Sequence, residues 1–439
     1  MIYRCREKKA LPPERPRMER GAGVLLHPTS LPGETGREIL GSAIRFLDFL
    51  QAAGQKIWQI LPLNPPGLGD SPYLSLSAFA GQEELLAGAF PLPRADDPEF
   101  AVFRRRQQYW LEDYALFQAI RKQYGGKPWQ QWPEVLKERN PEALARAGRE
   151  LAEEVTGRPE GSMCSSRHGG RSAGQPGPGH HLLGDMPLFV APDSADVWAH
   201  REYFQLDGDG YPTEVAGVPP DYFSAQGQVW GNPLYRWDAM AQDGWRWWQE
   251  RFRVLGEEAD WVRIDHFRGF EALWAVPAGA RDARQGRWKP GPGAALFHAV
   301  EQAVPDLGFV AEDLGLITRP VTELREGLGF PGMRILQFHT RTRQDGLTDF
   351  ATEPGCLAYT GTHDNNTLLG WLQEDLDEET FARIWQMVMP GEAGAPDRSR
   401  AREMTEPLLR YLYSRNARWA MVPGQDLLGL SSGSRMNIP

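Results

Sequence analysis

The sequence predicts an α/β fold, a (β/α)8 TIM barrel with inserted, mainly helical subdomains. Three observations predict it. Eight short apolar runs recur along the chain, and most are followed by a stretch rich in Gly, Pro or Asp and then by a helical pattern. Near-continuous apolar runs are typical of strands buried on both faces, as in a parallel sheet. Polar side chains close several runs, and in such barrels the functional groups gather at the carboxyl ends of the strands.

The eight candidate strands follow one another along the chain. The first is "GVLLHPTSLP" and the second is "KIWQILPLNP", and the amphipathic stretch "AIRFLDFLQAAG" lies between them. The other six lie at residues 181–190, 261–269, 307–315, 333–339, 356–365 and 417–426. Eight strand–helix units are the number that closes this barrel.

Two connections are longer than one helix needs, which indicates insertions into the barrel. Residues 82–160 are mostly helical in pattern, so we expect a helical insertion at 82–180. Residues 191–250 include the stretch "EVAGVPPDYFSAQGQVWGNPLY", so we expect a loop and helical insertion. Long loops of this kind are often functional. The catalytic barrel should span 18–439, and the basic residues 1–17 should be a disordered or misassigned N-terminal extension.

The composition excludes several classes of protein. With 439 residues, 41% hydrophobic and 24% charged, the chain can bury a sizeable core. A net charge of -10 disfavours nucleic acid as a partner. No apolar run is long enough for a membrane helix. The cysteines Cys5, Cys164 and Cys356 form no CxxC pair, which argues against a zinc cage or a disulfide framework.

Three carboxylates close candidate strands, in "RIDHFRG", "VAEDLG" and "GTHDN". These are Asp265, Glu312 and Asp364, and the fourth, fifth and seventh strands would bring them to one rim. A lone Asp at a strand end is more often a helix cap or a turn residue. Three of them, flanked by His266 and His363, favour a catalytic site. A pair about 5–5.5 Å apart would suit retaining glycoside chemistry.

Arg263 lies two residues before Asp265, so both side chains point to the same side of a strand. A guanidinium beside a carboxylate favours the ionised form, so we expect Arg263 to keep Asp265 charged. The stretches "GDSPY" and "WGNP" would be ordinary turns if they stood alone. His27 is either a satisfied core histidine or a site residue.

The motifs together carry a family resemblance. They are "LLHPTSLPG", "WQILPLNPPGLGDSPYLSLSAFAG", "GDMPLFVAPDSADVW", "VAGVPPDYFSAQGQVWGNPLY", "VRIDHFRGFEALW", "AEDLG", "PGMRILQF", "YTGTHDNNT" and "RMN", between residues 23 and 437. The sequence resembles the amylomaltases, the 4-alpha-glucanotransferases of glycoside hydrolase family 77 in the α-amylase clan. The resemblance implies transfer of α-1,4-glucan segments between maltooligosaccharides, with glucose as an acceptor and by a retaining double displacement.

The resemblance also implies roles for single residues. Asp265 would be the nucleophile, Glu312 the acid/base and Asp364 the residue that grips sugar hydroxyls. The residues implied in substrate binding are Arg263, His266 and His363 at the donor subsite, Ser71, Tyr73, Trp230, Asn232 and Asn437 as sugar contacts, and Tyr222 and Phe223 over the acceptor side. No cofactor, metal, nucleic acid or membrane partner is expected, and the expected location is the cytoplasm. Two alternatives stay open: an α-amylase-like hydrolase, and a damaged, non-catalytic product that at most binds glucan.

Three departures from the family pattern bear on that last alternative. The family has a Gly-rich turn where this chain reads "GETGREILG" at 33–41, and an amphipathic helix where it has the Gly- and Pro-rich residues 156–183. We interpret both stretches as local frameshifts in the gene or its sequencing, or else as natural flexible loops. The family also continues beyond residue 439, so the C-terminal end is expected to be truncated.

Overall fold

The computed structural model describes residues 18–33, 35–85, 98–152, 180–220, 224–342, 348–391 and 395–437. Within these ranges, no helix combines the length and the hydropathy needed to cross a bilayer. The expected N-terminal extension at 1–17 and most of the departure at 156–183 lie outside the described residues.

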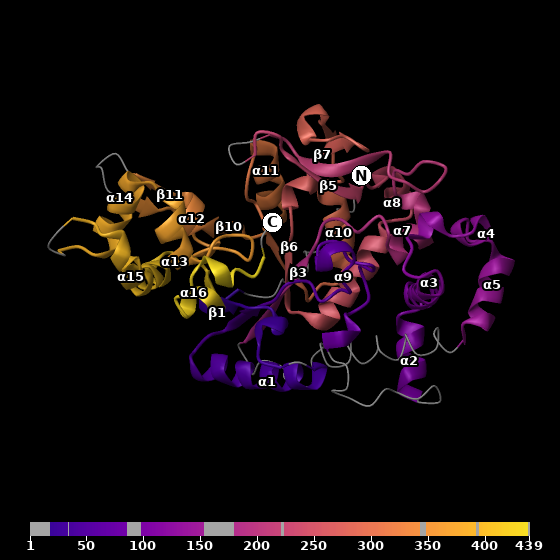
Figure 1. Ribbon diagram of the computed structural model, residues 1–439, viewed down its shortest axis with the longest axis horizontal. Helices are drawn as coiled ribbons and strands as arrows, with labels where there is room; N and C mark the ends of the chain where they lie inside the picture. The colour runs from indigo at the N-terminus through magenta and orange to yellow at the C-terminus, as the bar shows by residue number, and fades with distance from the viewer. Residues whose placement is uncertain are drawn as a thin grey trace, which may run out of the picture.

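An eight-stranded parallel sheet forms the centre of the molecule (Figure 1). Its strands are β1 (Gly21–Leu25), β2 (Ile57–Gln59), β3 (His181–Met186), β6 (Trp261–Ile264), β9 (Gly308–Ala311), β10 (Met333–Ile335), β13 (Leu357–Tyr359) and β14 (Trp419–Pro423). The order is β10-β13-β14-β1-β2-β3-β6-β9, so the first strand pairs with the last one of the chain. Each of the eight predicted runs contains one of these strands, which confirms the predicted barrel.

The sheet order ends at β10 on one side and at β9 on the other, so this seam carries no strand ladder. A backbone bond from the Ala311 amide to the Pro331 carbonyl, at 2.9 Å, joins the chain across it. The barrel is therefore nearly closed.

Large side chains fill the barrel from inside. The interior cluster is made of Ile57, Leu183, Trp261, Val310, Met333, Ile335, Leu357, Tyr359, Trp419 and Met421. The neighbours in sequence, such as Val262 and Phe309, belong instead to the core between the sheet and its helices. Since side chains alternate along a strand, both faces of the sheet are buried. This accounts for the near-continuous apolar runs in the sequence.

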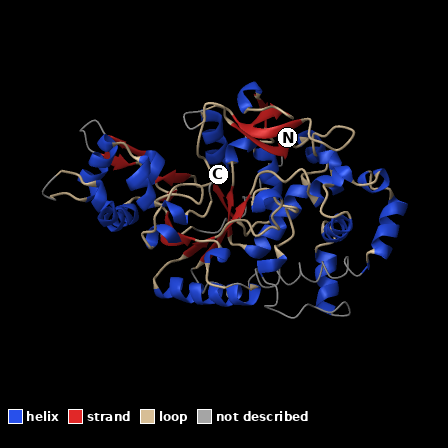
Figure 2. Cartoon of the chain, in the orientation of Figure 1, coloured by secondary structure: helices blue, strands red, loops and turns tan. Residues whose placement is uncertain are grey.

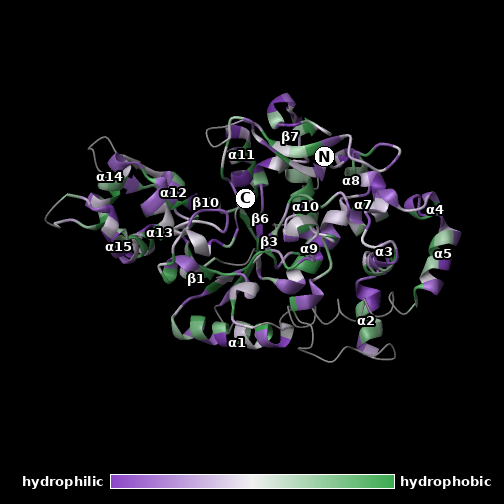
Figure 3. Cartoon of the chain, in the orientation of Figure 1, coloured by the Kyte–Doolittle hydropathy of each residue, from purple (hydrophilic) through white to green (hydrophobic). Residues whose placement is uncertain are grey.

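Helices cover the outside of the sheet. They are α1 (Gly36–Ala52), α9 (Arg246–Glu258), α10 (Ala294–Ala303) and α11 (Arg319–Leu328). Helix α1 begins with a capping box: Thr35 accepts a bond from the Glu38 amide, and the Glu38 side chain accepts one from the Thr35 amide. In Figure 3, α1 carries both hydrophobic and hydrophilic segments, as expected for a helix with one face on the core. Residues 36–41 thus form helix as written.

A group of helices lies beside the barrel in the region of the first expected insertion (Figure 1). These are α2 (Pro98–Arg106), α3 (Leu111–Gln123), α4 (Glu134–Lys137) and α5 (Pro141–Glu150), with α7 (Ala195–Ala199) and α8 (Trp237–Gln242) nearby in the second. Trp129 and Trp198 are fully buried between them. The division of the chain into a barrel and two insertions stays a prediction.

A four-stranded antiparallel sheet, seen at the top of Figure 2, is absent from the sequence prediction. It consists of β5 (Gln228–Pro233), β4 (Glu214–Val218), β7 (Ala272–Pro277) and β8 (Arg287–Pro290), in that order. Two of its strands come from residues 191–250, and two follow β6.

A further lobe with its own core follows β10 (left in Figure 1). It contains α12 (Leu336–His339), β11 (Thr340–Thr342), β12 (Thr348–Phe350), α13 (Leu368–Gly370), α14 (Glu378–Val388) and α15 (Ala401–Ser414). Helix α16 (Gly424–Leu427) follows β14.

Candidate active site

The three predicted carboxylates follow barrel strands at their carboxyl ends. Asp265 comes directly after β6, Glu312 directly after β9, and Asp364 in the loop after β13. Strands β6 and β9 are hydrogen-bonded neighbours, which brings the first two carboxylates side by side at one rim. The loops after parallel strands point away from the sheet at this end, where such barrels build their sites.

Glu312 is held by the loop that follows β6. The amide of His266 donates to Glu312 Oε2 at 2.7 Å, and the amide of Leu314 donates to Oε1 at 3.2 Å. The amide of Phe267 donates to the backbone carbonyl of Glu312 at 3.2 Å. The backbone of His266 is left-handed, with a φ of 48°, which is uncommon for a residue other than Gly. This is the residue whose amide donates to Glu312.

The pKa of Glu312 is raised from 4.5 to about 7. Burial is the main cause, because a low dielectric disfavours the charged form. The Arg263 guanidinium and the His266 amide oppose the shift. A carboxyl group that still holds its proton near neutral pH can act as a general acid.

Arg263 contacts two carboxylates. Its Nη1 donates to both oxygens of Asp185, at 2.7 and 2.8 Å, and its Nη2 lies 3.0 Å from Asp265 Oδ1. The side chains of Arg263 and Asp185 are 3% and 0% exposed, whereas that of Asp265 is 25% exposed. The guanidinium is thus held by the buried Asp185 and binds the partly exposed Asp265.

The expectation that Arg263 keeps Asp265 charged stays a prediction, although the guanidinium does lower the pKa of this carboxyl group. Burial and the carboxylates of Asp185 and Glu312 raise the pKa of Asp265, and Arg263 only opposes this rise. Burial is the main cause of the rise, and the guanidinium is shared with Asp185, so its charge does not fully offset the effect of burial.

Tyr73 connects the two sides of the rim. Its hydroxyl lies 2.7 Å from Asp185 Oδ2 and 2.6 Å from His363 Nε2, and its ring stacks on the imidazole with centroids 5.4 Å apart. Burial and the negative charge of Asp185 raise the pKa of Tyr73, so it stays a neutral phenol. If the hydroxyl donates to Asp185, His363 Nε2–H donates to the tyrosine oxygen.

Asp364 is held from two sides. His363 Nε2 lies 3.2 Å from Asp364 Oδ2, and Asn437 Nδ2 donates to Oδ1 at 2.7 Å. The Asp364 side chain is 40% exposed, so part of its carboxylate stays open to solvent. Burial lowers the pKa of His363, which favours a neutral imidazole. Residues 73 and 437, far apart in the sequence, thus meet at one site.

Two of the predicted sugar-binding residues, Trp230 and Asn232, lie on β5. Trp230 on β5 meets the His266 ring edge-on, with centroids 4.8 Å apart. Asn232 is 4% exposed and donates to the Val190 carbonyl at 2.9 Å, which orders the chain beneath Trp230. Its contact with sugar stays a prediction. Tyr222 and Phe223 lie outside the described residues.

Two smaller predictions have mixed outcomes. Ser71 Oγ accepts a bond from the Tyr73 amide at 3.3 Å, so it borders the site. His27 follows β1, and its buried Nδ1 has no hydrogen-bond partner among the described residues. Burial and nearby His363 lower the pKa of His27 to about 4, so it is neutral. This places His27 close to the site and leaves its role undecided.

Asp185 is the main residue that the sequence analysis missed. It lies in β3, is buried, and receives bonds from both Arg263 and Tyr73. The signal was present, because the third apolar run contains the carboxylate of "LLGDM", which lies near the end of β3.

Comparison with known proteins identifies the family of the chain. A sequence model of glycoside hydrolase family 77, described as 4-alpha-glucanotransferase, matches residues 26–90 and 82–439. The chain belongs to this family. The transferase is 42% identical to the 4-alpha-glucanotransferase of Thermus thermophilus, over 96% of this chain and 93% of that protein. It is 40% identical to the one of Synechocystis, over 96% and 92% of the two chains.

Solved structures agree with the family assignment. The amylomaltase from Streptococcus agalactiae in complex with acarbose matches the transferase with a TM-score of 0.85 and 33% identity, over 96% of this chain and 93% of that one. The amylomaltase from Corynebacterium glutamicum matches with a TM-score of 0.77 and 17% identity, over 96% and 69%, which shows a shared fold. The family assignment disfavours the hydrolase alternative.

Proposed function

We propose that this 4-alpha-glucanotransferase works by a retaining double displacement in which Asp265 is the nucleophile and Glu312 the acid/base. The observation that carries this proposal is the difference between the two neighbouring carboxyl groups. Glu312 has a pKa of about 7 and no ion pair with Arg263, whereas Asp265 has the guanidinium at 3.0 Å. Burial raises the pKa of both groups, but only Asp265 has a guanidinium beside it that favours its charged form. This difference suits Asp265 to nucleophilic attack and the protonated Glu312 to acid work.

In the first step, Asp265 Oδ2 attacks the anomeric carbon, because Oδ1 faces Arg263. The glycosidic bond breaks, and its oxygen takes the proton from Glu312. A covalent β-glucosyl ester and a shortened glucan result. In the second step, the 4-hydroxyl of an acceptor gives its proton to Glu312 and attacks the ester, which restores the α-1,4 linkage and frees Asp265.

The other predicted residues would bind sugar. Asp364 has an open carboxylate fixed by His363 and Asn437, which suits a pair of sugar hydroxyls. Trp230 offers an indole face on the other side of His266. We expect maltooligosaccharides and α-1,4-glucans as donors, glucose among the acceptors, and the cytoplasm as location. Transfer exceeds hydrolysis if an acceptor occupies its subsite before water reaches the ester.

The experiment is product analysis with maltotriose. We expect glucose together with glucans longer than maltotriose. Shorter sugars alone would indicate a hydrolase, and no products from a folded chain would indicate a binding protein.

Asp265→Asn should then lower the transfer rate by several orders of magnitude, because an amide cannot form the ester. Asp306→Asn, at an exposed residue before β9, is the matched control and should keep the parent rate. More than about a tenth of the parent rate in Asp265→Asn would remove this residue from the nucleophile role.

A further inference from the structure

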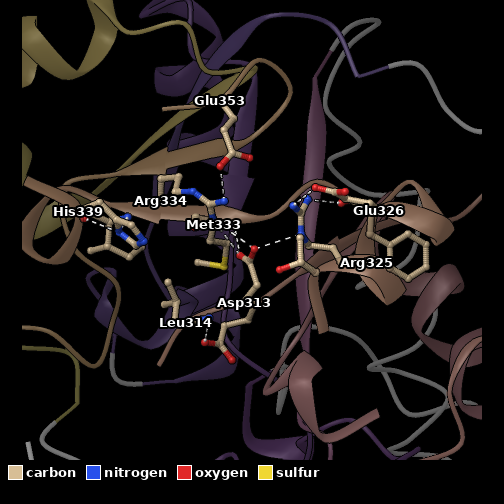
Figure 4. A network of polar contacts seen from close by, with 12 residues as sticks. Asp313, Leu314, Arg325, Glu326, Met333, Arg334, His339 and Glu353 are labelled. Atoms are coloured by element: carbon tan, nitrogen blue, oxygen red, sulfur yellow. Dashed lines mark hydrogen bonds and ion pairs between the residues drawn. The ribbon is translucent and has the colours of Figure 1, made fainter. Parts of the chain in front are cut away.

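A network of charged residues closes the barrel seam next to Glu312. Asp313 Oδ1 accepts the amide of Met333 at 2.7 Å, across the gap between β9 and β10. A strand ladder would have satisfied this amide with a backbone carbonyl. Here the carboxylate of the residue after Glu312 takes that place, as Figure 4 shows.

Two arginines compensate the charge of this carboxylate. Arg325 Nε on α11 lies 3.1 Å from Asp313 Oδ2, and Arg334 Nη1 on β10 lies 3.2 Å from the same oxygen. The Asp313 side chain is 4% exposed, and those of Arg325 and Arg334 are 10% and 14% exposed. Arg334 also reaches the more exposed Glu353 at 2.7 Å. The Met333 amide and the Arg334 guanidinium donate to this buried carboxylate, and Arg325 adds an ion pair, so together they fix its orientation.

Gly332 leaves room for this arrangement. A Cβ atom at residue 332 would lie 2.5 Å from Asp313 Oδ2, which is too close for any other residue without movement of the carboxylate. The close approach therefore depends on the chain on both sides of the seam.

Glu312 lies between two fixed anchors as a result. On one side, the amides of His266 and Phe267 hold its carboxylate and its carbonyl to the loop after β6. On the other side, Asp313 ties the next residue to β10 and α11. We propose that Asp313 is a positioning residue for the acid/base, fixing the place of Glu312 across the barrel seam and setting the charge around it. This inference rests on the proposed role of Glu312.

The charge of Asp313 changes the pKa of Glu312 in a direction that can be measured. The groups that face Glu312 are Arg263 from β6, Asp265 after it, and Asp313, whose own partners are Arg325 and Arg334. Asp313 raises the pKa of Glu312, because its negative charge disfavours a second one nearby. Removal of Asp313 should therefore lower this pKa, and removal of Arg325 should raise it.

The experiment compares pH profiles of kcat/KM for maltotriose in the parent, Asp313→Asn and Arg325→Gln. The alkaline limb reports the proton of the free enzyme's general acid. We expect this limb to move to lower pH by about one unit in Asp313→Asn and to higher pH in Arg325→Gln. Glu353→Gln, which removes only the outer partner of Arg334, is the matched control and should leave the limb in place.

A purely structural role would predict a different result. Asp313→Asn and Arg325→Gln would both lose stability and rate. The alkaline limb would stay in place or move in the same direction in both variants. That outcome overturns the inference. If Asp313→Asn does not fold, the upward shift in Arg325→Gln decides the question alone. If Glu312→Gln keeps the alkaline limb, the proposed role of Glu312 fails instead.

Discussion

Glu312→Gln should change how stability depends on pH, in addition to slowing the reaction. The carboxyl group has a pKa of about 7 in the folded protein and the ordinary value of 4.5 when exposed. Between these values the unfolded chain binds fewer protons than the folded one, so parent stability falls as the pH rises. From pH 5 to pH 8 this one group costs the parent roughly 2–3 kcal/mol of unfolding free energy. The variant has no such group.

Urea unfolding at pH 5 and pH 8 measures this difference. At pH 5 the variant should be less stable, because Gln offers one acceptor oxygen to the two amides of His266 and Leu314. A lost acceptor of this kind costs about 1–3 kcal/mol. Between pH 5 and pH 8 the unfolding free energy of the variant should rise relative to that of the parent by roughly 2–3 kcal/mol. An equal difference between the two proteins at both pH values would refute the raised pKa of Glu312.

Three further outcomes follow from the site. Glu312→Gln should lose less activity on donors with a good leaving group than on maltotriose, since such donors need less acid assistance; equal losses would argue against an acid role. Arg263→Gln should move the acidic limb of kcat/KM to higher pH, because the guanidinium opposes the raised pKa of Asp265; an unmoved limb contradicts that assignment. Tyr73→Phe should lower kcat/KM about tenfold or more, because the hydroxyl joins Asp185 to His363, and rates within a factor of two would show that the link is dispensable.

The sequence was most informative about the barrel and its rim. Strands such as β6 and β9 are buried on both faces, so their apolar runs are visible without any partner. Asp265 and Glu312 stand directly after those runs, and the order of the strands then brings them together. Tyr73 was found only through its motif, because nothing local predicts a contact with His363.

The rest depended on contacts that no local pattern encodes. In the antiparallel sheet of β4, β5, β7 and β8, the strand "RWKP" is short and mostly exposed, and carries no apolar signal. The raised pKa of Asp265 was not predicted, because the sequence shows neither the burial of this carboxyl group nor that Asp185 shares Arg263. Asp313 was not singled out, because its role lies in an interrupted ladder that appears only when the barrel forms.

The site also has a consequence for how the chain acquires activity. The side-chain contacts around Tyr73 join residues 112 and 290 positions apart, and Asn437 reaches back 73 positions to Asp364. Each contact closes a long loop, so its entropy is lost before the contact forms. Helices such as α1 and α9 need only local contacts. During refolding from urea, helical circular dichroism should therefore return first, and transferase activity should lag until β1 has met β14, which makes activity the most demanding reporter of barrel closure.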